Sequence, residues 1–179
     1  MKKTATLKNV LVANRSESCY IFGRILQNMK SQPFDPNFIT RHQRPRSHIG
    51  VGNLAEIVGQ DILKTYENFD KVIKPEVSFR GQPFDRLCKK AGKWYIVEIK
   101  GASHGFNGTP SHTQKERMRK VLKEVKGLEP AFLQIDLGAA KYKVRYGTEV
   151  EALIGKKKLI PQKISPIIDW VKDTISKSQ

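Results

Sequence analysis

The stretch Trp94-Tyr95-Ile96-Val97-Glu98-Ile99-Lys100 predicts a central β-strand, because aromatic and β-branched residues favour strands. Successive side chains of a strand point to opposite faces, so Glu98 and Lys100 share one face while Val97 and Ile99 share the other. An unpaired charge inside a central strand is unfavourable. We therefore expect Glu98 and Lys100 to serve a function; the alternative is an ion pair, which contributes little at a protein surface.

Two further strands are predicted before this one, at 72–79 and 84–89. The residues at 91–93, Ala-Gly-Lys, supply a turn, so the three segments form a small antiparallel meander. Asp85 lies on the second segment, and antiparallel pairing would bring its carboxylate towards Glu98. We expect two carboxylates to converge on one face, although Asp85 could also be a simple turn residue.

Helices and further strands are predicted on both sides of this meander. Apolar residues recur at three- and four-residue steps over 53–68, which predicts an amphipathic helix. Thr113-Gln114-Lys115-Glu116 matches a capping box that would open a second helix, and Gly127 would end it. The pattern closes with strands at 131–135 and 141–146 and an amphipathic helix at 164–175. This order predicts an α/β or α+β domain with a mixed sheet, whose last helix packs on the body or on a second subunit.

The chain carries a large excess of positive charge. Lys and Arg outnumber Asp and Glu by 33 to 17, which gives a formal net charge of +16 at pH 7. The positive charges in such an excess repel one another, and a polyanion commonly neutralises them. DNA is therefore the favoured partner, with anionic lipid or a generally basic surface as alternatives. The candidate phosphate contacts are Arg41, Arg44 and Arg46 in one loop and Lys115 and Arg119 on one helix, although either group could simply be a solvated surface.

The length of 179 residues suits one domain with a short appendage. We expect a basic N-terminal arm or DNA-contacting subregion at 1–52, a core at 53–150, and a basic turn with an amphipathic helix at 151–179. Within the arm, a short strand at 7–12 and a helical turn at 20–29 are candidates. The sequence has no apolar run near the roughly 20 residues that span a bilayer and no apolar signal core, which favours a cytoplasmic protein.

Asp85, Glu98 and Lys100 together suit phosphodiester chemistry. Carboxylate oxygens hold Mg²⁺, which keeps several waters and also takes oxygens of a substrate phosphate. Such an ion lowers the pKa of a bound water, and a lysine ammonium can orient that water or stabilise charge on the phosphoryl oxygens. A Glu-x-Lys sequence is a weak signal alone. The interpretation depends on the strand alternation, the return of Asp85, the flanking helices and the positive charge.

These residues resemble the PD-(D/E)XK nuclease superfamily, which includes type II restriction endonucleases and Holliday junction resolvases. The resemblance covers about 50–140, in the order helix, strand meander, helix, strand. The matching residues are Pro83-Phe84-Asp85, Glu98-Ile99-Lys100, Glu56 on the first helix and Gln114 at the start of the second. Phe84 separates the Pro and Asp that are adjacent in the family pattern.

The resemblance implies a restriction-endonuclease-like mixed sheet flanked by helices, and it assigns roles to the matching residues. Asp85 and Glu98 would bind Mg²⁺, for which Mn²⁺ can substitute, with the backbone carbonyl of Ile99 as a further ligand. Lys100 would be the catalytic lysine. Glu56 would join the inner or outer shell of the metal, and Gln114 would lie either at the metal or in solvent. The resemblance also implies a homodimer, since two DNA strands need two sites.

The favoured hypothesis is a Mg²⁺-dependent DNA endonuclease, a metal-dependent deoxyribonuclease most similar to type II restriction enzymes. A Holliday junction or repair nuclease is the alternative within the same class, and an RNA-directed nuclease is a third. A non-catalytic nucleic-acid-binding protein is the alternative from another class; in it, the acids and Lys100 would form structural ion pairs.

Overall fold

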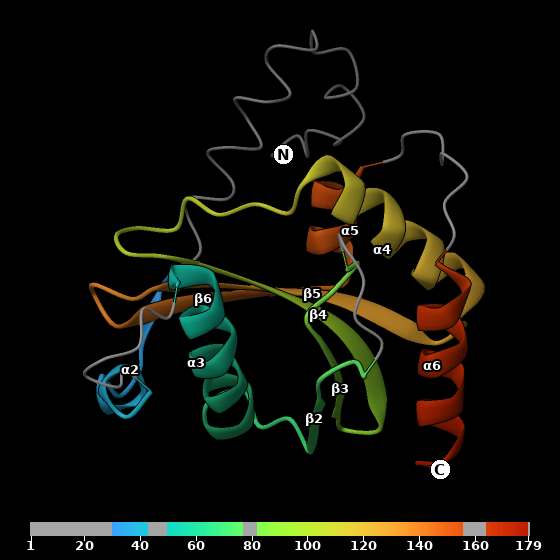
Figure 1. Ribbon diagram of the computed structural model, residues 1–179, viewed down its shortest axis with the longest axis horizontal. Helices are drawn as coiled ribbons and strands as arrows, with labels where there is room; N and C mark the ends of the chain where they lie inside the picture. Colours follow the sequence, from blue (N-terminus) through green and yellow to red (C-terminus); the bar gives the residue numbers. More distant parts are fainter. Residues whose placement is uncertain (1–29, 43–49, 77–81, 156–163, 179) are drawn as a thin grey trace, which may run out of the picture. The chain divides into compact units, whose positions relative to one another are not determined.

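The strand predicted at 94–99 lies inside a six-stranded mixed sheet in the computed structural model (Figure 1). The structure describes residues 30–42, 50–76, 82–155 and 164–178. Contacts divide the chain into a unit at Met1–Ser31 and a unit at Gln32–Gln179, and the second contains the sheet. Across the sheet the strands run in the order β1 (Gln32–Pro33), β6 (Lys141–Tyr146), β5 (Leu128–Asp136), β4 (Lys93–Ala102), β3 (Arg86–Lys90) and β2 (Lys71–Ile73).

The direction of each strand follows from its connection. Tight turns join antiparallel neighbours, as at Ala91-Gly92 between β3 and β4, where both residues have positive φ. β4 and β5 are parallel, so the chain must cross over between them, and α4 (His112–Glu124) makes that crossover. Parallel pairing places Glu98 beside Phe132 and Lys100 beside Gln134. The face of β4 that carries Glu98 and Lys100 is therefore continuous with one face of β5.

The two faces of the sheet are covered by different helices. Val97 and Ile99 pack in a cluster with α3 (Val51–Thr65), whereas Ile96 packs in a second cluster with α4, α5 (Thr148–Ile154) and α6 (Ser165–Ser176). Figure 1 shows α3 apart from α4 and α6, with the sheet strands between them. Both faces of β4 are buried, which explains its nearly continuous apolar sequence. Glu98 interrupts that sequence on the face of the second cluster.

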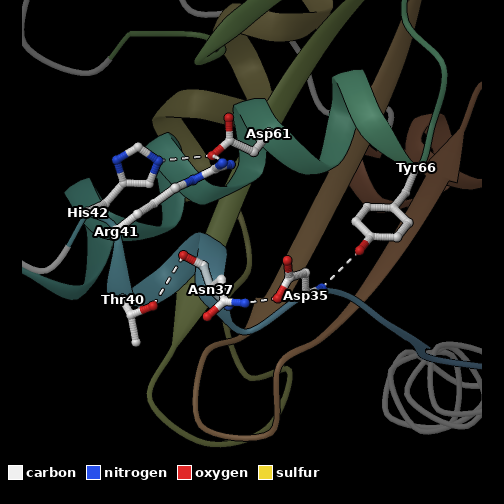
Figure 2. A network of polar contacts seen from close by, with 7 residues as sticks. All are labelled: Asp35, Asn37, Thr40, Arg41, His42, Asp61 and Tyr66. Atoms are coloured by element: carbon white, nitrogen blue, oxygen red, sulfur yellow. Dashed lines mark hydrogen bonds and ion pairs between the residues drawn. The ribbon is translucent and has the colours of Figure 1, made fainter.

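A short helix, α2 (Asn37–Thr40), adds to the cluster of α3 through Phe38. Figure 2 shows its polar anchors: Arg41 lies 2.6 Å and His42 2.9 Å from the Asp61 carboxylate on α3. The backbone N–H of Asp35 also donates to the hydroxyl of Tyr66 at 2.9 Å. Residues 32–42, which we assigned to the N-terminal arm, thus belong to the core unit.

Most of the predicted elements are present, and the mixed α/β class is confirmed. The helix predicted at 53–68 spans 51–65, and the strand predicted at 141–146 has those bounds. The strands predicted at 84–89, 94–99 and 131–135 correspond to β3, β4 and β5, and the helix predicted at 164–175 is α6, which packs on the body. Of the strand predicted at 72–79, β2 covers 72 and 73, residues 74–76 are not in a strand, and 77–79 lie outside the described residues. The candidates at 7–12 and 20–29 lie outside the described residues.

Two details of the prediction are wrong. The capping box of α4 is formed by Ser111 and Gln114, not by Thr113 and Glu116. Ser111 Oγ accepts from the backbone N–H of Gln114 at 3.2 Å, and Gln114 Oε1 accepts from the backbone N–H of Ser111 at 3.0 Å. The helix α5 was not predicted, because seven residues with two buried side chains carry little periodicity. Among the described residues, no helix is long and apolar enough to cross a membrane.

Glycines allow α3 to approach β4 closely. A Cβ atom at Gly101 would lie 2.2 Å from the Cβ of Ala55, and one at Gly59 would lie 2.9 Å from Ile99 Cγ2. A methyl group at Gly101 would require movement of the helix or the strand, and one at Gly59 would require movement of the Ile99 side chain. The contact fixes the end of β4, where the candidate functional residues lie.

We expect Gly101→Ala to destabilise the fold by about 1–3 kcal/mol, because the added methyl overpacks the contact with Ala55. Thermal and denaturant unfolding would measure the change. Gly52→Ala is the matched control, because nothing lies within 4 Å of its added Cβ and alanine is favoured in a helix. Equal stability of the two variants would contradict the close approach.

Candidate functional site

The three residues at the centre of the predicted site lie next to one another in the structure. Asp85 directly precedes β3, and its backbone N–H donates to the carbonyl of Val97 at 2.9 Å. Its side-chain Oδ2 accepts from the backbone N–H of Ile99 at 2.7 Å. Asp85 is therefore fastened by both backbone and side chain to the segment of β4 that carries Glu98 and Lys100.

Glu98 is fully buried, and its two carboxylate oxygens have different surroundings. Oε1 accepts from Gln114 Nε2 at 2.7 Å and contacts the ammonium of Lys100. Oε2 has no hydrogen-bond partner within the described part of the chain. A buried oxygen without a partner is unfavourable. Of the two carboxylate oxygens of Glu98, only Oε1 therefore has hydrogen-bond partners among the described residues.

Burial raises the pKa of Glu98 to about 8, and the nearby charge of Asp85 acts in the same direction. Lys100 and Gln114 oppose this rise through their contacts with Oε1. Burial also raises the pKa of Asp85, which the backbone N–H of Ile99 partly offsets, while the charge of Glu56 adds to the rise. Neighbouring carboxyl groups with raised pKa values occur more often at functional sites than elsewhere in proteins.

Gln114 links the start of α4 to the buried acid. Its Oε1 completes the capping box with Ser111, which leaves the amide Nε2 directed at Glu98. The sequence resemblance left Gln114 either at the metal or in solvent. The structure places it in direct contact with Glu98, where it holds one carboxylate oxygen in position.

Glu56 lies on α3, and its direct partner is Arg86. Arg86 Nη1 is 3.4 Å from Glu56 Oε2, and Nη2 donates to the Glu56 carbonyl at 3.3 Å. Arg86 is only 3% exposed, and its Nη1 also donates to the carbonyl of Asp85 at 2.7 Å. The charge of Glu56 reaches Asp85, but its contact is with the guanidinium.

Arg86 is a site residue that our sequence analysis missed. Its signal is an arginine directly after Asp85 within a strand whose next two residues are apolar. A buried arginine needs a fixed set of acceptors. Glu56 and the backbone of Asp85 supply acceptors for Nη1 and Nη2, so Arg86 connects α3 to the start of β3.

The candidate phosphate contacts are distributed differently. The Arg41 guanidinium pairs with Asp61 and is about half exposed (Figure 2). Arg119 Nη1 donates to the carbonyl of Gly155 at the end of α5, at 2.9 Å. Lys115 is half-buried in the first turn of α4, and Arg44 and Arg46 lie outside the described residues. Arg41 and Arg119 therefore already have protein partners.

The donor set suits a hard divalent cation that keeps much of its water. Among the described residues, no group of three or more His, Cys, Asp and Glu side chains could hold a metal, so a caged site is absent there. Two carboxylates are the usual protein contribution to Mg²⁺, which takes its other ligands from water and phosphate. The unpartnered Oε2 of Glu98 is an oxygen that such an ion would satisfy.

No protein-family model matches the chain, and neither the curated proteins nor the solved structures contain one with significant similarity to it.

The raised pKa of Glu98 predicts a dependence of stability on pH. Between its ordinary value of 4.5 and about 8, the folded protein keeps a proton that the unfolded chain has released. The free energy of unfolding therefore falls as pH rises through this window, by at most about 1.4 kcal/mol per pH unit from this group. In Glu98→Gln, which carries no titrating proton there, the fall should be smaller.

Denaturant unfolding of wild type and Glu98→Gln across this window, without divalent cations, measures the difference. The contribution of groups that do not interact with Glu98 cancels in the comparison, because these groups are common to both proteins. Parallel curves for the two proteins would show that Glu98 titrates normally.

Proposed function

We propose that this chain is a Mg²⁺-dependent deoxyribonuclease of the PD-(D/E)XK kind that hydrolyses phosphodiester bonds. The observation that carries the proposal is the cluster of Asp85, Glu98 and Lys100. One oxygen of its buried carboxylate contacts a lysine ammonium, and the other has no partner among the described residues. This is an arrangement that a cation and a phosphate would complete.

The order of the elements also supports the proposal. α3 is followed by the antiparallel strands β2, β3 and β4, then by α4 and by β5, which is parallel to β4. The resemblance to this superfamily implies the same succession of helix, strand meander, helix and strand. The excess charge of +16 favours a polyanionic substrate.

Each residue of the cluster has a separate task in this reaction. Asp85 and Glu98, with the carbonyl of Ile99, would hold Mg²⁺, which supplies polarisation of the phosphate and a more acidic bound water. Lys100 orients the attacking water and stabilises the charge that develops on the phosphoryl oxygens. Gln114 keeps Glu98 in place through its hydrogen bond to Oε1. The oxygen of water bonds to phosphorus as the bond to one sugar oxygen breaks.

Within this class, a type II restriction enzyme is the favoured form, and a Holliday junction or repair nuclease is the alternative. A homodimer would supply one site for each DNA strand. Arg41, Arg44, Arg46, Lys115 and Arg119 are the proposed DNA contacts, of which Arg41 and Arg119 would have to exchange their present partners for phosphate.

A non-catalytic nucleic-acid-binding protein is the proposal from another class. In that case the Lys100–Glu98 contact is a structural ion pair. Burial argues against this role, because a buried pair seldom stabilises a protein more than apolar residues of similar volume. The nuclease proposal requires that wild type cleaves DNA and that removal of either charge abolishes cleavage while leaving binding intact. The binding-protein proposal requires binding without cleavage.

We expect Asp85→Asn and Lys100→Ala to lower the cleavage rate by on the order of 100-fold or more while retaining DNA binding, because each removes a charge that acts on the reacting phosphate. The substrates are plasmid DNA, a four-way junction and single-stranded RNA, each with Mg²⁺. The product separates the nuclease types, and binding is measured in parallel.

Asp173→Asn and Lys177→Ala are the matched controls, since these residues form an exposed ion pair on α6 with side chains 54% and 73% exposed. Both controls should cut like wild type. Cleavage by the site variants at the wild-type rate would show that this cluster does not carry the reaction. No cleavage by wild type on any substrate would leave the binding protein as the surviving proposal.

Mg²⁺ binding should release a proton below pH 8. A cation needs the ionised carboxylate, whereas the raised pKa keeps Glu98 protonated in the free protein at neutral pH. Affinity should therefore rise with pH, by up to about tenfold per unit, and level off above about pH 8. Calorimetry in buffers of different ionisation enthalpy counts the protons, and Asp173→Asn is the control. Equal proton release at pH 7 and pH 9 would exclude this linkage.

A further inference from the structure

A buried glutamine side chain holds the loop that follows β4 against β5. Gln134 lies on β5 and is 4% exposed. Its amide Nε2 donates to two backbone carbonyls of the loop, to Phe106 at 2.9 Å and to Gly108 at 2.8 Å. Both hydrogens of the amide are thereby used on two loop residues two positions apart.

The fastened loop rests on the stem of Lys100. A Cβ atom at Gly108 would lie 2.6 Å from Lys100 Cβ and 3.3 Å from its Cγ, so only glycine permits this approach. Parallel pairing places Gln134 beside Lys100 on the neighbouring strand. Gln134 therefore holds the loop against Lys100, whose ammonium contacts Glu98.

Two further contacts keep the loop in the same place. Asp136, also on β5, accepts from the backbone N–H of Gly105 at 2.8 Å. The ammonium of Lys143 on β6 lies 4.6 Å from the ring centroid of Phe106, a favourable cation–π distance. The loop contains Ser103, Gly105 and Gly108, a composition typical of a flexible element, but the structure attaches it at several points.

We infer that Gln134 is a positioning residue for Lys100: by holding the loop at 103–108 on the lysine stem, it fixes where the ammonium lies. The kinetic consequence of this role rests on the proposed nuclease function, whereas the geometric consequence does not. Because the loop restricts the conformation of the Lys100 stem, the ammonium meets Glu98 and a phosphate from a constant direction. This favours the reactive arrangement.

A purely structural role for Gln134 is the competing explanation, since any buried amide with two hydrogen bonds stabilises its surroundings. The two roles differ in their readouts. A structural role changes the free energy of unfolding alone. A positioning role also changes the chemical accessibility of Lys100 and, in an active enzyme, kcat more than KM.

Two variants test the role by independent routes. Gln134→Glu keeps the size of the side chain but replaces the NH2 group, which carries both N–H donors, with a carboxylate oxygen that repels the loop carbonyls. Gly108→Ala leaves Gln134 intact and forces a methyl group against Lys100 Cβ. Tyr142→Phe is the control, because it removes a hydrogen bond that does not involve the loop, from the hydroxyl of the buried Tyr142 to Gln32 Oε1 at 3.1 Å.

The experiment measures acetylation of Lys100 by mass spectrometry without DNA, together with kcat and KM on cleaved DNA. In Gln134→Glu and Gly108→Ala, Lys100 should acetylate severalfold faster, and kcat should fall about 10- to 100-fold with little change in KM. In Tyr142→Phe both should match wild type. Unchanged acetylation in the two variants, or an equal fall in kcat in the control, would overturn the inference.

The same experiment separates this inference from the proposed function. If wild type cuts no substrate, the nuclease proposal fails, and the acetylation of Lys100 alone decides whether Gln134 positions it. If wild type cuts DNA but acetylation and kcat do not change in Gln134→Glu and Gly108→Ala, the nuclease proposal stands and the positioning role is wrong.

Discussion

Burial of the Glu98 carboxyl group is the constraint on which the rest of this site depends. A buried ionised carboxylate is strongly unfavourable unless other groups compensate it. Gln114 and Lys100 compensate Oε1 only, and the raised pKa shows that they do not suffice to keep the group charged at neutral pH. Glu98 is therefore held in place with unused capacity to bind a proton or a cation.

The fold supplies each partner of Glu98 through a different element. β4 carries Lys100 two positions later on the same face, and the start of β3 brings Asp85 to the neighbouring backbone. The crossover α4 begins at a capping box in which the side chain of Gln114 is both cap and donor. The parallel strand β5 adds Gln134, which holds the loop beside Lys100. The connection from β4 to β5 thus contains both the cap of α4 and the loop that Gln134 holds.

Local patterns predicted the parts of this arrangement that depend on one element or on adjacent strands. The alternation of Glu98 and Lys100, the return of Asp85 and the strand at 141–146 all follow from a period of two and from turns. Arg86 and Gln134 were missed because each side chain has partners far away in the sequence, Glu56 for Arg86 and two loop carbonyls for Gln134. The exact cap residue was wrong because Ser111 and Thr113 both fit the pattern, and tertiary contact with Glu98 selects Gln114.

Whether Glu98 binds a proton or a cation also affects the contact of Lys100 with Glu98. In the free protein the ammonium contacts Glu98 Oε1, and its side chain is 27% exposed, so it reaches both the buried acid and the surface. A cation shared by the two carboxylates would occupy oxygens of Glu98 and repel the nearby ammonium, since both groups carry positive charge. Lys100 would be freer to turn to an incoming phosphate while its stem stays in place under Gly108. A structural ion pair has no need of a fixed stem with a movable charge, whereas a residue that meets a substrate does.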